Sequence, residues 1–181
     1  MKTIKLLCES AERYAFEDHQ EKPGAEHFLL AALELPDGTA KKVLAKFDVD
    51  TMCLKRSIEA QYSQALRKVG VEAPQMDNIG EDITPRTTLF RASASGEAVI
   101  QVLASQQKRR GDTKLLSAHV LAVLAETKVG VVARIFRILD LDAEIVKREA
   151  ELVCISNVGW SLFFAKTRHQ FNEIAGAIAI V

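Results

Sequence analysis

A gapless internal repeat constrains this chain more than any other feature. Shifting the sequence by 92 positions places residues 3–60 on residues 95–152 without an insertion or deletion. The matches lie at caps, turns and apolar stripes, so the duplicated unit is a helical scaffold. Ten pairs are identical: Lys22/Lys114, His27/His119, Leu29/Leu121, Glu34/Glu126, Gly38/Gly130, Asp48/Asp140, Asp50/Asp142, Lys55/Lys147, Arg56/Arg148 and Glu59/Glu151.

Each repeat is predicted to contain four helices. The first helices are expected to open at Thr3 and Ser95, because threonine and serine side chains accept hydrogen bonds from first-turn amides. The second helices, around residues 26–33 and 118–125, are apolar nearly all round. This pattern is typical of a buried helix, so these two segments are expected to form the centre of each repeat.

Glycine and aspartate residues punctuate the second half of each repeat. Gly38 and Gly130 break the chain before the third helix. The segments Asp48-Val49-Asp50 and Asp140-Leu141-Asp142 then separate the third helix from the fourth. The second aspartate of each segment is predicted to cap the fourth helix, while the apolar residue between packs back as a hydrophobic staple. The sequence therefore predicts an all-α fold.

The expected domain organisation follows from the repeat. Residues 1–152 are expected to form one double-repeat domain, with repeat 1 at 3–60 and repeat 2 at 95–152. Residues 70–94 carry Gly70, Pro74, Gly80 and Pro85, and are expected to form a long inter-repeat loop. Residues 153–181 form a C-terminal extension, either as a ninth helix packed on the body or as a partly exposed tail.

Charge and cysteine content exclude several classes of partner. The chain has 24 basic and 24 acidic residues, so the attraction that drives non-specific nucleic-acid binding is missing. The sequence shows no signal peptide and no apolar run long enough to cross a membrane. Its three cysteines are far apart and lack metal-ligand spacing, so neither a zinc site nor a disulfide framework is expected. We expect a cytoplasmic protein that binds no metal, cofactor, nucleic acid or membrane.

The repeated motifs resemble a known family. Its pattern is matched by Ala11-x3-Ala15, by Glu26-His27-x-Leu29-Leu30-x-Ala32-Leu33 and by the apolar run that ends at Asp50. The register returns in the second repeat, at His119-x-Leu121 and at Leu139-Asp140-Leu141-Asp142. Over residues 3–152 the chain resembles the N-terminal domain of Clp-type AAA+ unfoldases and disaggregases, here as a stand-alone chain. The resemblance implies two four-helix Clp repeats about a pseudo-twofold axis.

The resemblance also implies a function. Clp N-terminal domains receive unfolded or tagged polypeptides, or adaptor proteins, for the ATP-driven ring to which they are normally fused. The chain lacks a GxxxxGK[ST] phosphate loop, so it is expected not to bind ATP and not to be an enzyme. We therefore expect a non-catalytic protein-binding module that serves a Clp ATPase ring. The alternatives are a truncated N-terminal part of a Clp ATPase subunit and, less favoured, a helical nucleic-acid-binding regulator.

The sequence offers one ligand-binding candidate and no catalytic residue. In some relatives the glutamate before the repeated histidine receives the guanidinium of a phosphorylated arginine; here Glu26 stands in that place in repeat 1, but Ala118 in repeat 2. The alternative for Glu26 is a first-turn glutamate that favours the helix dipole. His27 and His119 are expected to be hydrogen-bonded structural residues. The basic cluster 108–110 is expected to end a helix, where cations complement free carbonyls.

Overall fold

The structure is a computed structural model of the chain, and it describes residues 2–68, 70, 91–110 and 114–156. All the regular structure within these residues is helical, and no strand occurs among them. An eighth helix begins at residue 143 and is described as far as residue 156. The seven helices before it are α1 (Lys2–Glu17), α2 (Ala25–Glu34), α3 (Thr39–Ala45), α4 (Thr51–Lys68), α5 (Ala94–Arg110), α6 (Ser117–Ala125) and α7 (Val131–Ile138). The predicted all-α fold is confirmed.

The helices begin at the spacing of the sequence repeat. The first residues of α1 and α5, of α2 and α6, and of α3 and α7 each differ by 92. The eighth helix begins at residue 143, again 92 after the first residue of α4. The four helices of the second half thus follow those of the first in order and register.

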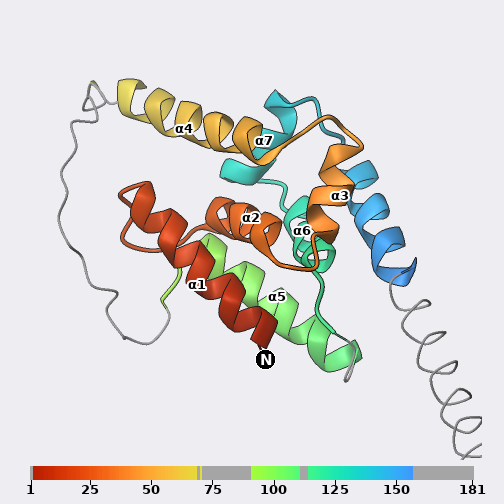
Figure 1. Cartoon of the computed structure of the whole chain (residues 1–181). Helices are drawn as coiled ribbons and strands as arrows, with labels where there is room; N and C mark the ends of the chain where they lie inside the picture. Colours follow the sequence, from red (N-terminus) through yellow and green to blue (C-terminus); the bar gives the residue numbers. More distant parts are fainter. Residues whose placement is uncertain (1, 69, 71–90, 111–113, 157–181) are drawn as a thin grey trace, which may run out of the picture.

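Two apolar helices form the centre of the molecule. Residues 25–33 of α2 and 117–125 of α6 are buried, and the two helices pack against each other. Figure 1 shows them between α1 and α5 on one side and α4 and α7 on the other. The third helix of each half packs on the central helix of the other half: α3 packs on α6, and α7 packs on α2. This reciprocal packing buries both central helices in one shared core, as in a twofold arrangement.

A polar cluster, the Asp37 clasp, joins the two halves beside this core. One carboxylate oxygen of Asp37, Oδ2, accepts four hydrogen bonds, from the backbone and hydroxyl groups of Thr39 and Ser117. In return the Ser117 hydroxyl accepts from the amide of Ala40 and the Thr39 hydroxyl from the amide of Ala118, each at 2.9 Å. The first turns of α3 and α6 are therefore capped by residues of the opposite half.

The two aspartate-rich segments adopt the same conformation in both halves. Asp48 and Asp140 lie in the left-handed region, with φ values of 56° and 53°. The carboxylate of Asp50 then accepts from the amide of Cys53 at 2.7 Å, and that of Asp142 from the amide of Ile145 at 3.2 Å. The intervening Val49 and Leu141 are buried in the core. The prediction that Asp50 and Asp142 cap the fourth helices is confirmed.

The predicted openings of the first helices are wrong. Both α1 and α5 begin one residue earlier than expected, so Thr3 and Ser95 lie inside the first turn. The cap of α5 is Ser93, whose carbonyl accepts from Glu97 at 2.8 Å and whose hydroxyl accepts from Gly96 at 3.4 Å. The Ser95 hydroxyl instead accepts from the amide of Ala25, at the start of α2. The Ser95 hydroxyl therefore links the two halves, and Ser93 caps α5.

The inter-repeat loop and the C-terminal extension lie largely outside the described residues. Residue 94, expected to end the inter-repeat loop, already belongs to α5, and most of that loop (71–90) lies outside the described residues. The eighth helix continues to residue 156, past residue 152 where the alignment ends. Residues 157–181, which hold most of the expected C-terminal extension, also lie outside the described part of the chain. None of the described helices is long and apolar enough to cross a membrane.

Loss of either aspartate cap should destabilise the protein. Asp50→Ala and Asp142→Ala should each lower the free energy of unfolding by about 0.5–2 kcal/mol, because first-turn amides lose their acceptor. Urea unfolding of each variant measures this. Asp140→Asn is the control, since asparagine tolerates the left-handed conformation and that carboxylate caps nothing. Unchanged stability in both alanine variants would show that the caps contribute nothing.

Candidate functional site

The ligand-binding candidate, Glu26, lies in the first turn of α2, where the sequence placed it. Gly24 precedes the helix in an extended conformation, and the Glu26 side chain folds back toward it. A Cβ atom on Gly24 would lie 2.8 Å from Oε2 of Glu26, which is too close for a side chain at that position. The absence of a side chain on Gly24 thus makes room for the carboxylate.

The Glu26 carboxylate is nearly buried and partly engaged. Its side chain is 10% exposed, and its Oε1 accepts a hydrogen bond of 2.7 Å from the hydroxyl of Tyr62 on α4. Burial, together with the negative charge of Glu26, raises the pKa of Tyr62 far above its usual value. Tyr62 therefore keeps its proton at neutral pH and remains a donor. Among the described residues, Oε2 of Glu26 receives no hydrogen bond.

His27 stabilises this turn through hydrogen bonds of its ring. Its Nδ1 accepts from the amide of Gly24 at 2.8 Å, so the ring proton is assigned to Nε2, which lies 3.2 Å from Oδ2 of Asp18. His119 makes the equivalent bond, accepting from the amide of Leu116 at 2.9 Å. Both rings thus satisfy a free amide at a helix start. The predicted structural role of the two histidines is confirmed.

The equivalent site in the second half has lost its polar groups. At an offset of 92, Glu26 corresponds to Ala118, Tyr62 to Cys154 and Asp18 to Arg110. The positive charge of Arg110 therefore acts on His119, whereas His27 lies beside the carboxylate of Asp18. Burial, and then the charge of Arg110, lower the pKa of His119 to about 4. An anionic acceptor of this kind occurs in the first half, and Ala118 cannot supply a second one.

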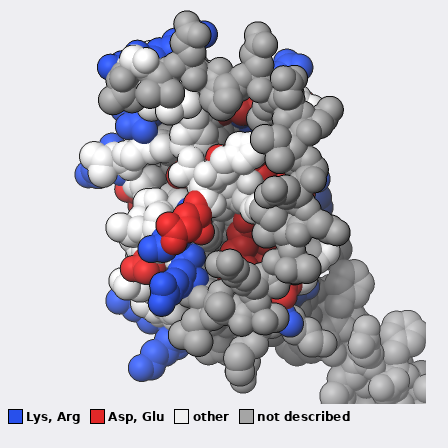
Figure 2. All heavy atoms as spheres, turned by 90° about the vertical axis from the view of Figure 1, so that its left-hand side faces the viewer, with Lys and Arg blue, Asp and Glu red and all other residues white. Residues whose placement is uncertain are grey.

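Charges of both signs are mixed on the described surface shown in Figure 2. The basic cluster Lys108, Arg109 and Arg110 ends α5, as predicted. Figure 2 shows blue and red side chains side by side on the face it presents, without a broad patch of one sign among the described residues. No three histidine, cysteine, aspartate or glutamate side chains of the described residues come together as metal ligands.

Sequence reasoning missed two residues beside the first turn of α2: Tyr62, which donates to Glu26, and Asp18, which pairs with His27. Tyr62 packs against the core, and its hydroxyl also reaches a carboxylate 36 positions away in the sequence. Asp18 lies after α1 in a segment without a matching motif. The change of each position between the two halves, Tyr62 against Cys154 and Asp18 against Arg110, is the signal that could have identified them.

The first half of the chain is similar to a known protein family. Residues 2–87 match the family model of the Clp repeat (R) N-terminal domain. The match thus covers α1 to α4, and the second half is related to it by the internal repeat. A search of curated proteins finds no significant match to the chain.

The buried neutral ring of His119 should make stability depend on pH. Between pH 6.5 and about 4 this histidine takes up a proton only when the chain unfolds. Stability should therefore fall as the pH falls through that window, by at most about 3 kcal/mol from this group. Urea unfolding between pH 7 and 4.5 measures the slope. His119→Gln should flatten the slope, while the exposed-histidine control His19→Gln should not. Equal slopes in all three proteins would contradict this assignment.

Proposed function

We propose, on the premise that residues 2–87 form a Clp repeat (R) N-terminal domain, that the chain is a non-catalytic protein-binding module. It recognises substrate polypeptides or adaptor proteins for a Clp-type ATP-dependent chaperone or protease. The family match is the observation that carries this proposal, and the fold agrees with it, since the eight helices of the described residues form two equivalent halves around one core. The partner ring supplies ATP hydrolysis, and this chain supplies recognition.

The Glu26 site supports a specific form of recognition. A carboxylate that is 10% exposed, with Oε1 held by Tyr62 and Oε2 without a hydrogen bond among the described residues, offers an acceptor to a guanidinium. Charge-assisted hydrogen bonds of this kind are stronger than neutral ones, especially where water is partly excluded. Since Ala118 replaces the glutamate in the second half, one phosphorylated arginine per chain is the expected stoichiometry.

The proposed partners and location are consistent with the charges and the cysteines. A net charge of zero gives no broad attraction to nucleic acid, so polypeptides remain the favoured partners. Cys8, Cys53 and Cys154 are all free thiols, as expected in a reducing compartment. A cytoplasmic location is therefore part of the proposal.

Titration with two ligands tests the proposal. An unfolded, labelled protein should bind weakly, with a Kd near the micromolar range or above, since a shallow surface must order a flexible chain. That affinity should change little with salt. Free phosphoarginine should bind once per chain and weaken as salt rises. If neither ligand binds, substrate recognition is contradicted and adaptor docking remains as the role.

Three variants separate the Glu26 site from general binding. Glu26→Gln keeps an acceptor for Tyr62 but removes the charge, so phosphoarginine affinity should fall about tenfold or more. Glu26→Ala should lose binding as well, with thermal melts to confirm folding. Glu97→Ala is the matched control, because Glu97 is an exposed first-turn glutamate of α5. Phosphoarginine binding that survives Glu26→Gln would rule out this carboxylate as the acceptor.

A further inference from the structure

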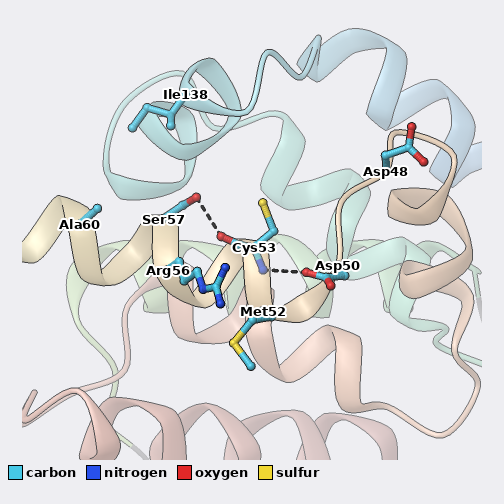
Figure 3. A pocket seen from close by; sticks show the side chains of 8 residues that line it. All are labelled: Asp48, Asp50, Met52, Cys53, Arg56, Ser57, Ala60 and Ile138. Carbon is cyan, nitrogen blue, oxygen red and sulfur yellow. Dashed lines mark hydrogen bonds between the residues drawn. The ribbon is translucent and has the colours of Figure 1, made fainter.

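A hollow of about 430 Å³, which neither Glu26 nor Tyr62 lines, lies between the first half of α4 and the C-terminal end of α7. Figure 3 shows Ile138 on one wall, with Cys53, Ser57 and Ala60 on the wall that faces it. Asp48 and Asp50 lie at one end, where the chain enters α4. The volume is in the range of sites that hold a small molecule or a few side chains.

The hollow is bordered by apolar side chains left open to water. Met52 and Ile138 are each 56% exposed, although both are large and apolar. Single exposed apolar residues are common on proteins, but two that border one hollow form a continuous surface. Covering them with a partner would remove apolar area from water, which favours association.

The internal repeat shows that this hollow is a departure from the scaffold. At an offset of 92, Ile138 corresponds to Lys46 and Ser57 to Glu149. At the junction of α3 with the eighth helix, Lys46 Nζ lies 2.7 Å from Glu149 Oε2, so an ion pair bridges the two helices. The junction of α7 with α4 carries Ile138 and Ser57 at these two positions, and neither can form that bridge. The same helix junction is thus bridged on one side of the molecule and open on the other.

The charges around the hollow select the kind of partner. Asp48 is exposed, and its carboxylate takes part in no hydrogen bond or ion pair among the described residues. Asp50 is occupied as the α4 cap, and Arg56 on the α4 wall carries the opposite charge. A cation is therefore favoured at the Asp48 end and disfavoured beside Arg56.

We infer that this hollow binds an extended polypeptide segment in which a large apolar side chain adjoins a lysine or arginine. The apolar side chain lies between Met52 and Ile138, and the basic side chain reaches Asp48. This inference rests on the proposed function and deepens it, since it names a second recognition surface, separate from Glu26, and the sequence that the surface prefers. Arg56 fixes the direction of the segment by repelling its basic end.

The test uses the full chain and a fluorescein-labelled peptide, Gly-Ser-Leu-Phe-Lys-Arg-Gly-Ser, with a Glu-Glu version in place of Lys-Arg. Ser57→Glu with Ile138→Lys transplants the Lys46–Glu149 pair and should weaken peptide binding about tenfold or more. The matched control, Lys46→Ile with Glu149→Ser, opens the other junction and should retain wild-type affinity. Asp48→Asn keeps the left-handed turn and should reduce the preference for the Lys-Arg peptide over the Glu-Glu peptide.

The outcomes separate this inference from the proposed function. Amide shifts in NMR spectra at Met52, Cys53 and Ile138, lost in the transplanted variant, would support the hollow as the site. Wild-type affinity in a folded transplanted variant would overturn it, even where unfolded protein still binds and the proposed function stands. Sedimentation that shows a dimer broken by the transplanted pair, with peptide affinity unchanged, would also overturn it, because a second copy would then be the occupant.

Discussion

The fold depends on the Asp37 clasp, because it joins the two halves through hydrogen bonds as well as through apolar contact. The Asp37 carboxylate, the Thr39 hydroxyl and the Ser117 hydroxyl satisfy amides at the starts of α3 and α6. Thr39 and Ser117 are buried, so these groups would lose free energy if left without partners. Burial alone would raise the pKa of Asp37, yet the four donors hold it below its usual value. The carboxylate therefore stays charged, and only one relative placement of the halves satisfies it.

The proposed recognition sites lie where the two halves differ. The shared elements, including the aspartate caps and the histidine bonds at the central helices, maintain the scaffold twice. Glu26 and Tyr62 form an anionic acceptor where the second half has Ala118 and Cys154. Ile138 leaves the junction of α4 and α7 open, whereas Lys46 bridges the equivalent junction of α3 with the eighth helix. Duplication supplies the framework, and divergence at a few positions gives each half its own surface chemistry.

Much of the framework could be predicted from the sequence, because it depends on local rules that occur twice. The apolar central helices, Asp50, Asp142 and the paired histidines follow from periodicity, capping and register. The clasp could not be predicted, since its residues correspond to Val129, Val131 and Ala25 and repeat nowhere. The cap of α5 was misplaced because Ser93 and Ser95 are equally suitable by type. Tertiary contact decides between them, since the Ser95 hydroxyl binds the amide of Ala25 across the halves.

A double-mutant cycle between Asp37 and Ser117 tests most directly whether the clasp joins the halves. The free energy of unfolding is measured by urea for wild type, Asp37→Ala, Ser117→Ala and the double variant. If the clasp acts as a unit, the two losses should be coupled by about 1 kcal/mol or more, with a single unfolding transition in each protein. A cycle of Asp37 with the distant cap Asp142 should be additive. Additivity between Asp37 and Ser117, within about 0.3–0.5 kcal/mol, would contradict the account, because the clasp would then not act as a unit that joins the halves.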